Sequence, residues 1–485
     1  MKFYLFPYEM VKPGEKVIIY GAGAVGYSYV VQIIKTKYCT LAGVVDQNYR
    51  DFATDTIEIL NPDIILQDDY DKIIIANRNE DAISEIYDYL VKTFSVPSNK
   101  IVARIPRLEY LLDSKMTNTL WRRKRAQWNT VTGIKIAVKL GIGRGDNIFF
   151  KKFLTHLVAK IRVPYSVDIY APSAADHQLN FVRTLFSDCR FIGDVVDDKK
   201  FFKYASSYDL AIIQPIFILD FYHCDMESLK KKDTSFAEII EKIINKLKSY
   251  KLDPYSYTDN YVYIQRARYL KKNVYTMYDF DGLLGISDTK VNIPLIPAYR
   301  EVYDQLQLPE KYITVNYGCG YSRHNNEKGF MPNKVWPLEY YEQYIRLFHN
   351  KYKTIKVVQV GRKDSPHMKN ADFYVMGESL EVVKYVLQNS LLHIDCEGGL
   401  THIATQLGTK CIVLFGPTPL HFFAYKQNIN IKALGCSECC FLLEDDLACL
   451  KGLKRPECME SIFPEQVMKQ TEFFFTNNTA QKHNH

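Results

Sequence analysis

Long hydrophobic runs are missing from this sequence of 485 residues, in which no stretch reaches the roughly 18 apolar residues that a membrane-spanning helix needs. The N-terminus, "MKFYLFPYEMVKPGEK", lacks the apolar core and the small-residue cleavage site of a signal peptide. Low-complexity tracts are also lacking, and a composition of 47% hydrophobic and 24% charged residues is globular. We therefore expect a cytoplasmic protein with substantial buried cores.

An excess of one charge is lacking as well. The formal net charge is +7, and Lys and Arg are interspersed with Asp and Glu instead of forming one long block. This pattern weakly favours an anionic ligand, and we expect no nucleic-acid partner. Eleven cysteines are present, and in a cytoplasmic chain they indicate reduced thiols or metal ligands instead of a disulfide framework.

The length predicts about three domains of ordinary size. Residues 1–110 form the first, in which "KVIIYGAGAVGYSYVVQIIKT" predicts a strand, a glycine-rich turn and a helix. A later helix is expected at about residues 81–93. Gly21, Gly23, Gly26 and the later Asp46 have the spacing of a Rossmann-like nucleotide site. Two interpretations stay open: the glycines bind a nucleotide, or they only let the helix pack closely on the strand.

Two further alternations of strands and helices follow. Residues 111–132 contain several arginines beside tryptophans and predict a basic helical linker, which either rests on a membrane surface or serves as a solvated connector. Residues 133–300 and 301–475 each repeat apolar strands and amphipathic helices at short spacing. This repetition predicts an α/β fold with parallel sheets covered by helices on both faces.

The stretch "HIDCEGGLTHIATQLGTKCIVLFGPTP", from residue 393 to residue 419, resembles a ligand-binding edge of such a sheet. Its glycines begin a helix, so backbone N–H groups and the helix dipole can approach a phosphate. Hydroxyl and carboxylate side chains nearby suit a sugar. The candidate donor-binding residues are Glu397, Gly398, Gly399, Leu400, Thr401, His402, Gly416 and Thr418.

Four blocks in order give the region from about residue 133 to residue 470 a resemblance to glycosyltransferase family nine, the ADP-heptose heptosyltransferases. They are "GIGRGDNIFF", "NKVWPLEYYEQYI", "EGGLTHIATQLGTKCIVLFGPTP" and "CMESIFPEQV". The resemblance implies a GT-B architecture of two Rossmann-like domains, the acceptor domain at 133–300 and the nucleotide-sugar donor domain at 301–475. The N-terminal Rossmann-like domain is additional to this plan.

The resemblance also implies roles for two side chains. Asp146 would be the general base that takes a proton from the acceptor hydroxyl; the alternative is an N-cap for a helix starting at Asn147. Lys334 would neutralise the departing diphosphate; the alternative is an ordinary exposed lysine before a helix. Glu397 stands where many enzymes of the lipopolysaccharide core carry Asp, and His402 is as consistent with a helix histidine as with a ligand contact.

A cysteine-rich segment, "GCSECCFLLEDDLACLKGLKRPECMESI", supplies enough thiols for a tetrahedral metal site. The segment is similar to the autotransporter heptosyltransferase branch, which has a four-cysteine iron site, so iron and zinc both stay open. The candidate ligands of the cysteine-rich loop 436–458 are Cys436, Cys439, Cys449 and Cys458, with Cys440 as a spare. The alternative is unliganded cysteines that pack as small hydrophobic groups. No catalytic metal is expected.

The sequence thus predicts an inverting glycosyltransferase that transfers a heptose-like sugar from a nucleotide diphosphate sugar, ADP-heptose by resemblance, to a hydroxyl of a protein or of lipopolysaccharide. Peripheral membrane contact and homo-oligomerisation stay open. Two alternatives belong to other classes: a nucleotide-dependent oxidoreductase or regulatory sensor that uses the N-terminal glycines, and a non-catalytic scaffold.

Overall fold

The computed structural model divides the chain into two compact units, Met1–Thr130 and Val131–His485, which we describe separately. The structure describes residues 2–51, 58–110, 133–172, 176–318, 331–436, 438–443 and 448–482. The predicted linker, residues 111–132, lies outside these ranges. No helix among the described residues is long and apolar enough to span a bilayer.

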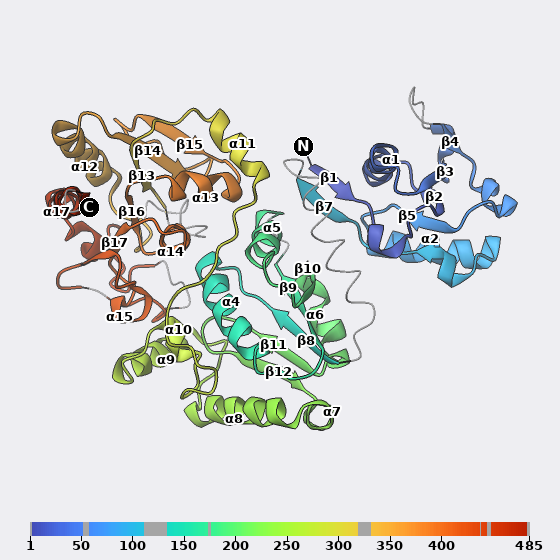
Figure 1. The fold of residues 1–485 in the computed structure, drawn as a ribbon, viewed down its shortest axis with the longest axis horizontal. Helices are drawn as coiled ribbons and strands as arrows, with labels where there is room; N and C mark the ends of the chain where they lie inside the picture. Colours follow the sequence, from blue (N-terminus) through green and yellow to red (C-terminus); the bar gives the residue numbers. More distant parts are fainter. Residues whose placement is uncertain are drawn as a thin grey trace. The chain divides into compact units, whose positions relative to one another are not determined.

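The first unit contains a parallel sheet with strand order β4-β3-β2-β5-β6 and a separate antiparallel pair, β1 and β7 (Figure 1). The strands are β1 (Lys2–Leu5), β2 (Lys16–Tyr20), β3 (Thr40–Val45), β4 (Ile59–Leu60), β5 (Lys72–Ile75), β6 (Ile101–Val102) and β7 (Arg107–Tyr110). The helices are α1 (Ala24–Thr36) and α2 (Glu80–Phe94).

Alternation along β2 explains why helices cover both faces of this sheet. Val17 and Ile19 pack in one buried cluster with residues of α1, whereas Ile18 and Tyr20 pack in another with residues of α2. Successive side chains of a strand point to opposite faces, so a strand that is apolar throughout needs cover on both sides. The continuous apolar run of β2 therefore predicts the sandwiching helices.

The start of α2 follows from its sequence. The side chain of Asn79 accepts hydrogen bonds from the backbone N–H groups of Asp81 and Ala82, and two acidic residues occupy the first turn. Both features stabilise a helix N-terminus, because they satisfy free N–H groups and complement the helix dipole. The predicted helix at 81–93 is confirmed, with one more residue at each end.

The second unit begins with a five-stranded sheet of order β10-β9-β8-β11-β12, parallel except for its last strand. Its strands are β8 (Ile134–Lys139), β9 (Tyr165–Ala171), β10 (Ile192–Asp197), β11 (Leu210–Ile213) and β12 (Asp220–Cys224). Its helices are α4 (Arg144–Val158), α5 (Asp176–Leu185), α6 (Phe201–Tyr204), α7 (Met226–Lys232), α8 (Thr234–Tyr250), α9 (Tyr257–Tyr269) and α10 (Val274–Met277).

A parallel sheet of order β15-β14-β13-β16-β17-β18 completes the unit. Its strands are β13 (Tyr312–Asn316), β14 (Lys356–Gly361), β15 (Phe373–Met376), β16 (His393–Cys396), β17 (Cys411–Phe415) and β18 (Ile429–Lys432). Its helices are α11 (Ala298–Gln305), α12 (Leu338–Lys351), α13 (Leu380–Gln388), α14 (Gly399–Gln406), α15 (Leu420–Phe423), α16 (Glu457–Glu460) and α17 (Pro464–Lys482). The predicted α/β class with parallel sheets is confirmed.

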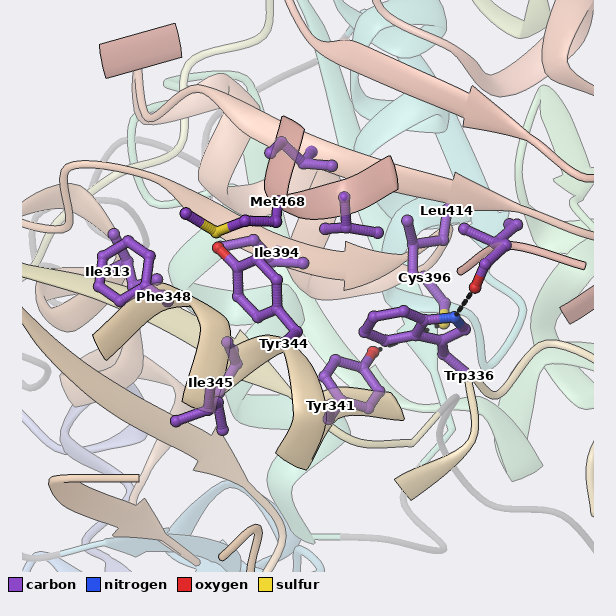
Figure 2. Close-up of a cluster of buried hydrophobic side chains, with 14 of the residues drawn as sticks. Ile313, Trp336, Tyr341, Tyr344, Ile345, Phe348, Ile394, Cys396, Leu414 and Met468 are labelled. Atoms are coloured by element: carbon purple, nitrogen blue, oxygen red, sulfur yellow. Dashed lines mark hydrogen bonds between the residues drawn. The ribbon is translucent and has the colours of Figure 1, made fainter. Parts of the chain in front are cut away.

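One buried cluster holds the last sheet to helices α12, α16 and α17, and Figure 2 shows part of it. Trp336 is fully buried there, and its indole N–H donates a 2.8 Å hydrogen bond to the carbonyl oxygen of Ile462, just before α17. The hydroxyls of Tyr344 on α12 and Thr471 on α17 lie 3.0 Å apart. These two buried hydrogen bonds fix the position of α17 against the sheet, because a shift of the helix would leave buried polar groups unpaired at a cost in free energy.

We expect Trp336→Phe to lower the free energy of unfolding by about 2–4 kcal/mol, because it leaves a cavity and an unpaired Ile462 carbonyl. Urea unfolding followed by circular dichroism measures this. Phe473→Leu, on the exposed face of the same helix α17, is the control and should change the midpoint little. Equal midpoints for Trp336→Phe and the control would contradict the role of the indole bond.

Candidate functional site

The glycine-rich turns lie at the points where the strand order of each sheet reverses. Successive strands are added on one side of the central strand up to this point and on its other side after it. In the first two sheets the turns at 21–26 and 141–145 follow the central strands β2 and β8. In the third sheet the segment 397–399 follows β16, which lies beside the central strand β13. Ligands of open α/β sheets bind at such switch points, beyond the carboxyl ends of the strands.

Glu397, Lys334 and His402 form a buried ionic cluster at the third of these points. One oxygen of Glu397, Oε2, lies 3.5 Å from Lys334 Nζ, and the other, Oε1, lies 3.0 Å from His402 Nε2. Burial alone would raise the pKa of Glu397, but the charge of Lys334 and the His402 bond outweigh it and lower this pKa to about 2. The cluster therefore keeps a carboxylate ionised although only 6% of its side chain is exposed.

A hydrogen-bond chain extends this cluster toward the first half of the unit. His402 Nδ1 lies 3.0 Å from the hydroxyl of Tyr425, which lies 2.7 Å from the hydroxyl of Tyr275 on α10. Gln406 on α14 donates to the Tyr275 hydroxyl at 3.1 Å. All these polar groups are buried or partly buried, so the chain fixes the ring of His402 between Glu397 and Tyr425.

The first turns of α4 and α14 face each other. A Cβ at residue 145 would lie 2.7 Å from His402 Cδ2, and a Cβ at residue 399 would lie 3.4 Å from the Cβ of Arg144. Phe149 on α4 also packs edge-on against the His402 ring, with centroids 4.8 Å apart. The glycines therefore bring two helix N-termini, each with free N–H groups and the positive end of a dipole, to one place.

Asp146 lies in the first turn of α4. The helix begins at Arg144 with Gly143 as its N-cap, so the alternative of Asp146 as the N-cap of a helix starting at Asn147 is wrong. A Cβ at residue 143 would lie 2.0 Å from Asp146 Oδ2. The carboxylate therefore occupies the space that a side chain at Gly143 would take. The Asp146 carbonyl oxygen accepts a 3.0 Å hydrogen bond from Gln214.

The other candidate donor-binding residues separate into two groups. Gly398 and Gly399 have no atom within 3.4 Å of the Cβ position, which suits the approach of a ligand to the backbone. Thr401 is buried and donates its hydroxyl to the Cys396 carbonyl oxygen at 3.0 Å. A Cβ at Gly416 would lie 2.3 Å from Met459 Sδ, so this glycine permits the packing of α16.

Leu400 is partly exposed in the first turn of α14, and Thr418 is buried after β17. The structure thus brings Lys334, Glu397, His402 and the two glycines of α14 together. Sequence reasoning missed Tyr275 and Tyr425, because two hydroxyls 150 residues apart follow no local periodicity.

The turn of the first unit is well filled. Asp46 accepts hydrogen bonds from the backbone N–H groups of Ala22 at 2.8 Å and Asn48 at 2.9 Å. A Cβ at Gly26 would lie 1.9 Å from the Gly21 carbonyl oxygen, whereas a Cβ at Gly23 would meet nothing within 4 Å. Close packing accounts for Gly26, and backbone contacts within the turn account for Asp46.

The cysteines of loop 436–458 lie near one another without forming a ligand set. Burial, and then the neighbouring thiols of Cys436, Cys439 and Cys449, raise the pKa of Cys458 to about 12. Among the described residues, however, no three His, Cys, Asp or Glu side chains converge in a group that could hold a metal ion. The donor set has the right chemistry for iron or zinc, but its geometry here is not that of a tetrahedral site.

The fold and the site of the second unit indicate a class of protein. It is an α/β protein with two sheets, in which a lysine and two opposed helix N-termini suit an anionic ligand. Residues 323–444 match the family model of glycosyltransferase family 9 (heptosyltransferase). This match confirms the resemblance seen in the sequence, since residues 323–444 of the chain are similar to this family of glycosyltransferases. No curated protein matches the chain.

Three solved structures are similar to this chain. The ADP-heptose lipopolysaccharide heptosyltransferase II of E. coli is 13% identical, with 71% of this chain and 100% of that chain covered and a TM-score of 0.44. A family 9 glycosyl transferase from Veillonella parvula is 15% identical, with 71% and 97% covered and a TM-score of 0.44. The iron-containing dodecameric glycosyltransferase TibC of enterotoxigenic E. coli is 12% identical, with 72% and 81% covered and a TM-score of 0.45.

The low pKa of Glu397 predicts a specific acid sensitivity. Its folded-state pKa of about 2 lies below the ordinary value of 4.5, so the ionised carboxylate contributes stability above about pH 4.5 and loses it as the pH falls toward 2. This contribution is on the order of 3 kcal/mol. We expect Glu397→Gln to be less stable than the parent protein at pH 7, with the difference shrinking below pH 5.

Urea midpoints of the parent protein and the variant between pH 7 and pH 3 measure this difference. Glu301→Gln, an exposed carboxylate on α11, is the matched control and should follow the parent profile. A constant difference between Glu397→Gln and the parent protein across this range would show that the carboxylate is not stabilised by its ionised partners.

Proposed function

We propose that this protein is an inverting glycosyltransferase with a GT-B architecture, which transfers a heptose-like sugar from ADP-heptose to a hydroxyl of a protein or lipopolysaccharide acceptor. The acceptor domain is residues 133–300 and the donor domain is residues 301–475. The observation that carries the proposal is the buried Lys334–Glu397–His402 cluster beside the opposed first turns of α4 and α14. The family match supports the reaction class.

The donor diphosphate binds at the N-terminus of α14. Backbone N–H groups at Gly398, Gly399 and Leu400 face a phosphate without an intervening side chain, and the helix dipole favours its charge. Lys334 Nζ lies 3.5 Å from Glu397 Oε2, so the lysine places a positive charge at the same turn, where it would attract a phosphate oxygen. Glu397 then orients Lys334 and accepts from a sugar hydroxyl.

Asp146 is the general base of the reaction. It takes the proton of the acceptor hydroxyl while the hydroxyl oxygen attacks the anomeric carbon and the bond from that carbon to the diphosphate oxygen breaks. The nucleoside diphosphate leaves with the bonding electrons, and Lys334 and the amides of α14 stabilise its growing charge. Attack from the face opposite the leaving group inverts the anomeric configuration.

Two features lie outside this reaction. The four cysteines Cys436, Cys439, Cys449 and Cys458 would hold a structural iron or zinc ion if their thiols, which lie near one another but form no ligand set here, converge on it. Self-association is the second, and a dodecamer is described for the similar protein TibC. The first unit is an additional Rossmann-like domain, whose Asp46 is engaged by its own turn, so no dinucleotide role is assigned to it.

Isothermal titration calorimetry with ADP, GDP, UDP and NADH tests the proposal. We expect ADP to bind most tightly, and Lys334→Met to weaken it by about 10- to 100-fold, the effect of losing a hydrogen bond to a charged group. Asp146→Asn should bind ADP as the parent does, because the base contacts the acceptor. Lys311→Met, an exposed lysine before β13, is the control.

NADH binding without nucleoside diphosphate binding would instead move the function to the first unit. Binding of no nucleotide at all would favour the scaffold. Either result would contradict the proposed transferase.

The metal proposal predicts about one iron or zinc ion per purified chain. We expect Cys449→Ser to lose this ion and to lower the thermal midpoint, whereas Cys224→Ser, a partly buried cysteine outside the loop, should keep both unchanged. Elemental analysis and calorimetry with and without a chelator measure the two effects. A metal-free parent protein with an unchanged midpoint in chelator would contradict the site.

A further inference from the structure

Arg144 lies where the two halves of the second unit meet. It is the first residue of α4, and its Cβ would be 3.4 Å from a Cβ placed on Gly399, the first residue of α14. The next residue, Gly145, has its backbone nitrogen 3.8 Å from the same point. The arginine therefore comes from the acceptor half but lies against the phosphate-binding turn of the donor half.

The side chain of Arg144 is partly buried. No hydrogen bond or ion pair to it occurs within the part of the chain that the structure describes, although residue 144 is only partly exposed. Burial, and then the positive charge of Arg362, lower its pKa. Placing two like charges close together at a partly desolvated point costs free energy unless an anion joins them.

Arg362 locates this point on the donor sheet. It follows β14, at the edge of the sheet where the carboxyl ends of β13, β14, β16 and β17 meet. Its own partner is Asp364, with bonds of 2.9 and 3.0 Å. Both neighbours of Arg144, Gly399 and Arg362, thus belong to the donor half, which favours the donor and not the acceptor as its ligand.

The groups around Arg144 favour a phosphate as the ligand. Guanidinium groups bind phosphate oxygens through two parallel N–H bonds, and the N-terminus of α14 supplies further N–H groups beside it. Lys334 lies near the same turn, because its Nζ is 3.5 Å from Oε2 of Glu397, two residues before Gly399. A diphosphate offers more acceptor oxygens and more negative charge than a single phosphate to a lysine, an arginine and a helix N-terminus that act together.

We propose that Arg144 is a donor-binding residue, which reaches across from the acceptor half and forms a bidentate contact with the diphosphate of the nucleotide sugar. This inference rests on the proposed function, since it assigns a further residue to the same site. Arg144 and Lys334 hold the diphosphate from two sides, and the ligand itself joins the two halves of the unit. Donor binding then orders Asp146, which lies in the same helical turn as Arg144.

The test compares ADP with adenosine, which lacks the phosphates. We expect Arg144→Met, which keeps the aliphatic stem, to weaken ADP binding by about 10- to 100-fold and to leave adenosine binding unchanged. Arg144→Lys should recover only part of the loss, because a lysine cannot form the two-pronged contact. Arg300→Ala, an exposed arginine paired with Asp304 on α11, is the control. Circular dichroism confirms that each variant is folded.

The outcomes separate the two proposals. If Lys334→Met weakens ADP and Arg144→Met does not, the role of Arg144 is wrong and the transferase site stands. An equal loss of ADP and adenosine in Arg144→Met also overturns its role, because the effect is then structural. If the parent protein binds no nucleoside diphosphate, both proposals fail.

Discussion

The absence of a side chain at residue 145 is the constraint on which the candidate site depends. His402 occupies the space that a Cβ at this position would take, and the ring is held there by hydrogen bonds at both nitrogens. Because the ring cannot move away, the helix that carries residue 145 can approach only if that residue is glycine. The close approach of α4 and α14, which places Arg144 beside Gly399, depends on this contact.

Two carboxylates at the end of β16 show how strongly local environment decides ionisation. Burial raises the pKa of Asp395, although His393 and Asn316 lie beside it. Glu397, two residues later and also buried, has its pKa lowered because a lysine and a histidine contact its two oxygens. The difference is one of partners and not of depth, since both side chains are almost inaccessible to water. Glu397, at the glycine-rich turn, therefore keeps its negative charge.

The sequence predicted the repeating parts of this protein well. Apolar strands and amphipathic helices have short periods, so the parallel sheets and the helix at 81–93 could be read from local pattern. Motif spacing likewise led to the family and to Glu397, His402 and Lys334, which the structure brings together. The alternative of Asp146 as N-cap puts the start of α4 three residues late, because Asp is a common N-cap while here the cap is Gly143.

What the sequence could not show depends on distance along the chain. The hydroxyls of Tyr275 and Tyr425 pair across 150 residues. Arg144 becomes a candidate only because it lies beside Gly399, which belongs to another helix. The cysteine spacing predicted a metal site, but spacing does not fix how far apart the thiols lie in a loop without regular structure. Contacts of this kind arise when the two halves of the second unit pack together. A short segment of sequence contains no information about them.

The packing of α17 has a consequence for synthesis on the ribosome. The buried cluster of the last sheet contains Ile313 from its central strand and Phe474 from helix α17. At 5–20 residues per second, the strand therefore waits roughly 8–30 s before the helix that covers it has been made. The first unit has a shorter delay, because its described strands and helices all lie between Lys2 and Tyr110. Nascent chains thus carry a folded leading unit while an uncovered apolar sheet behind it needs protection from aggregation.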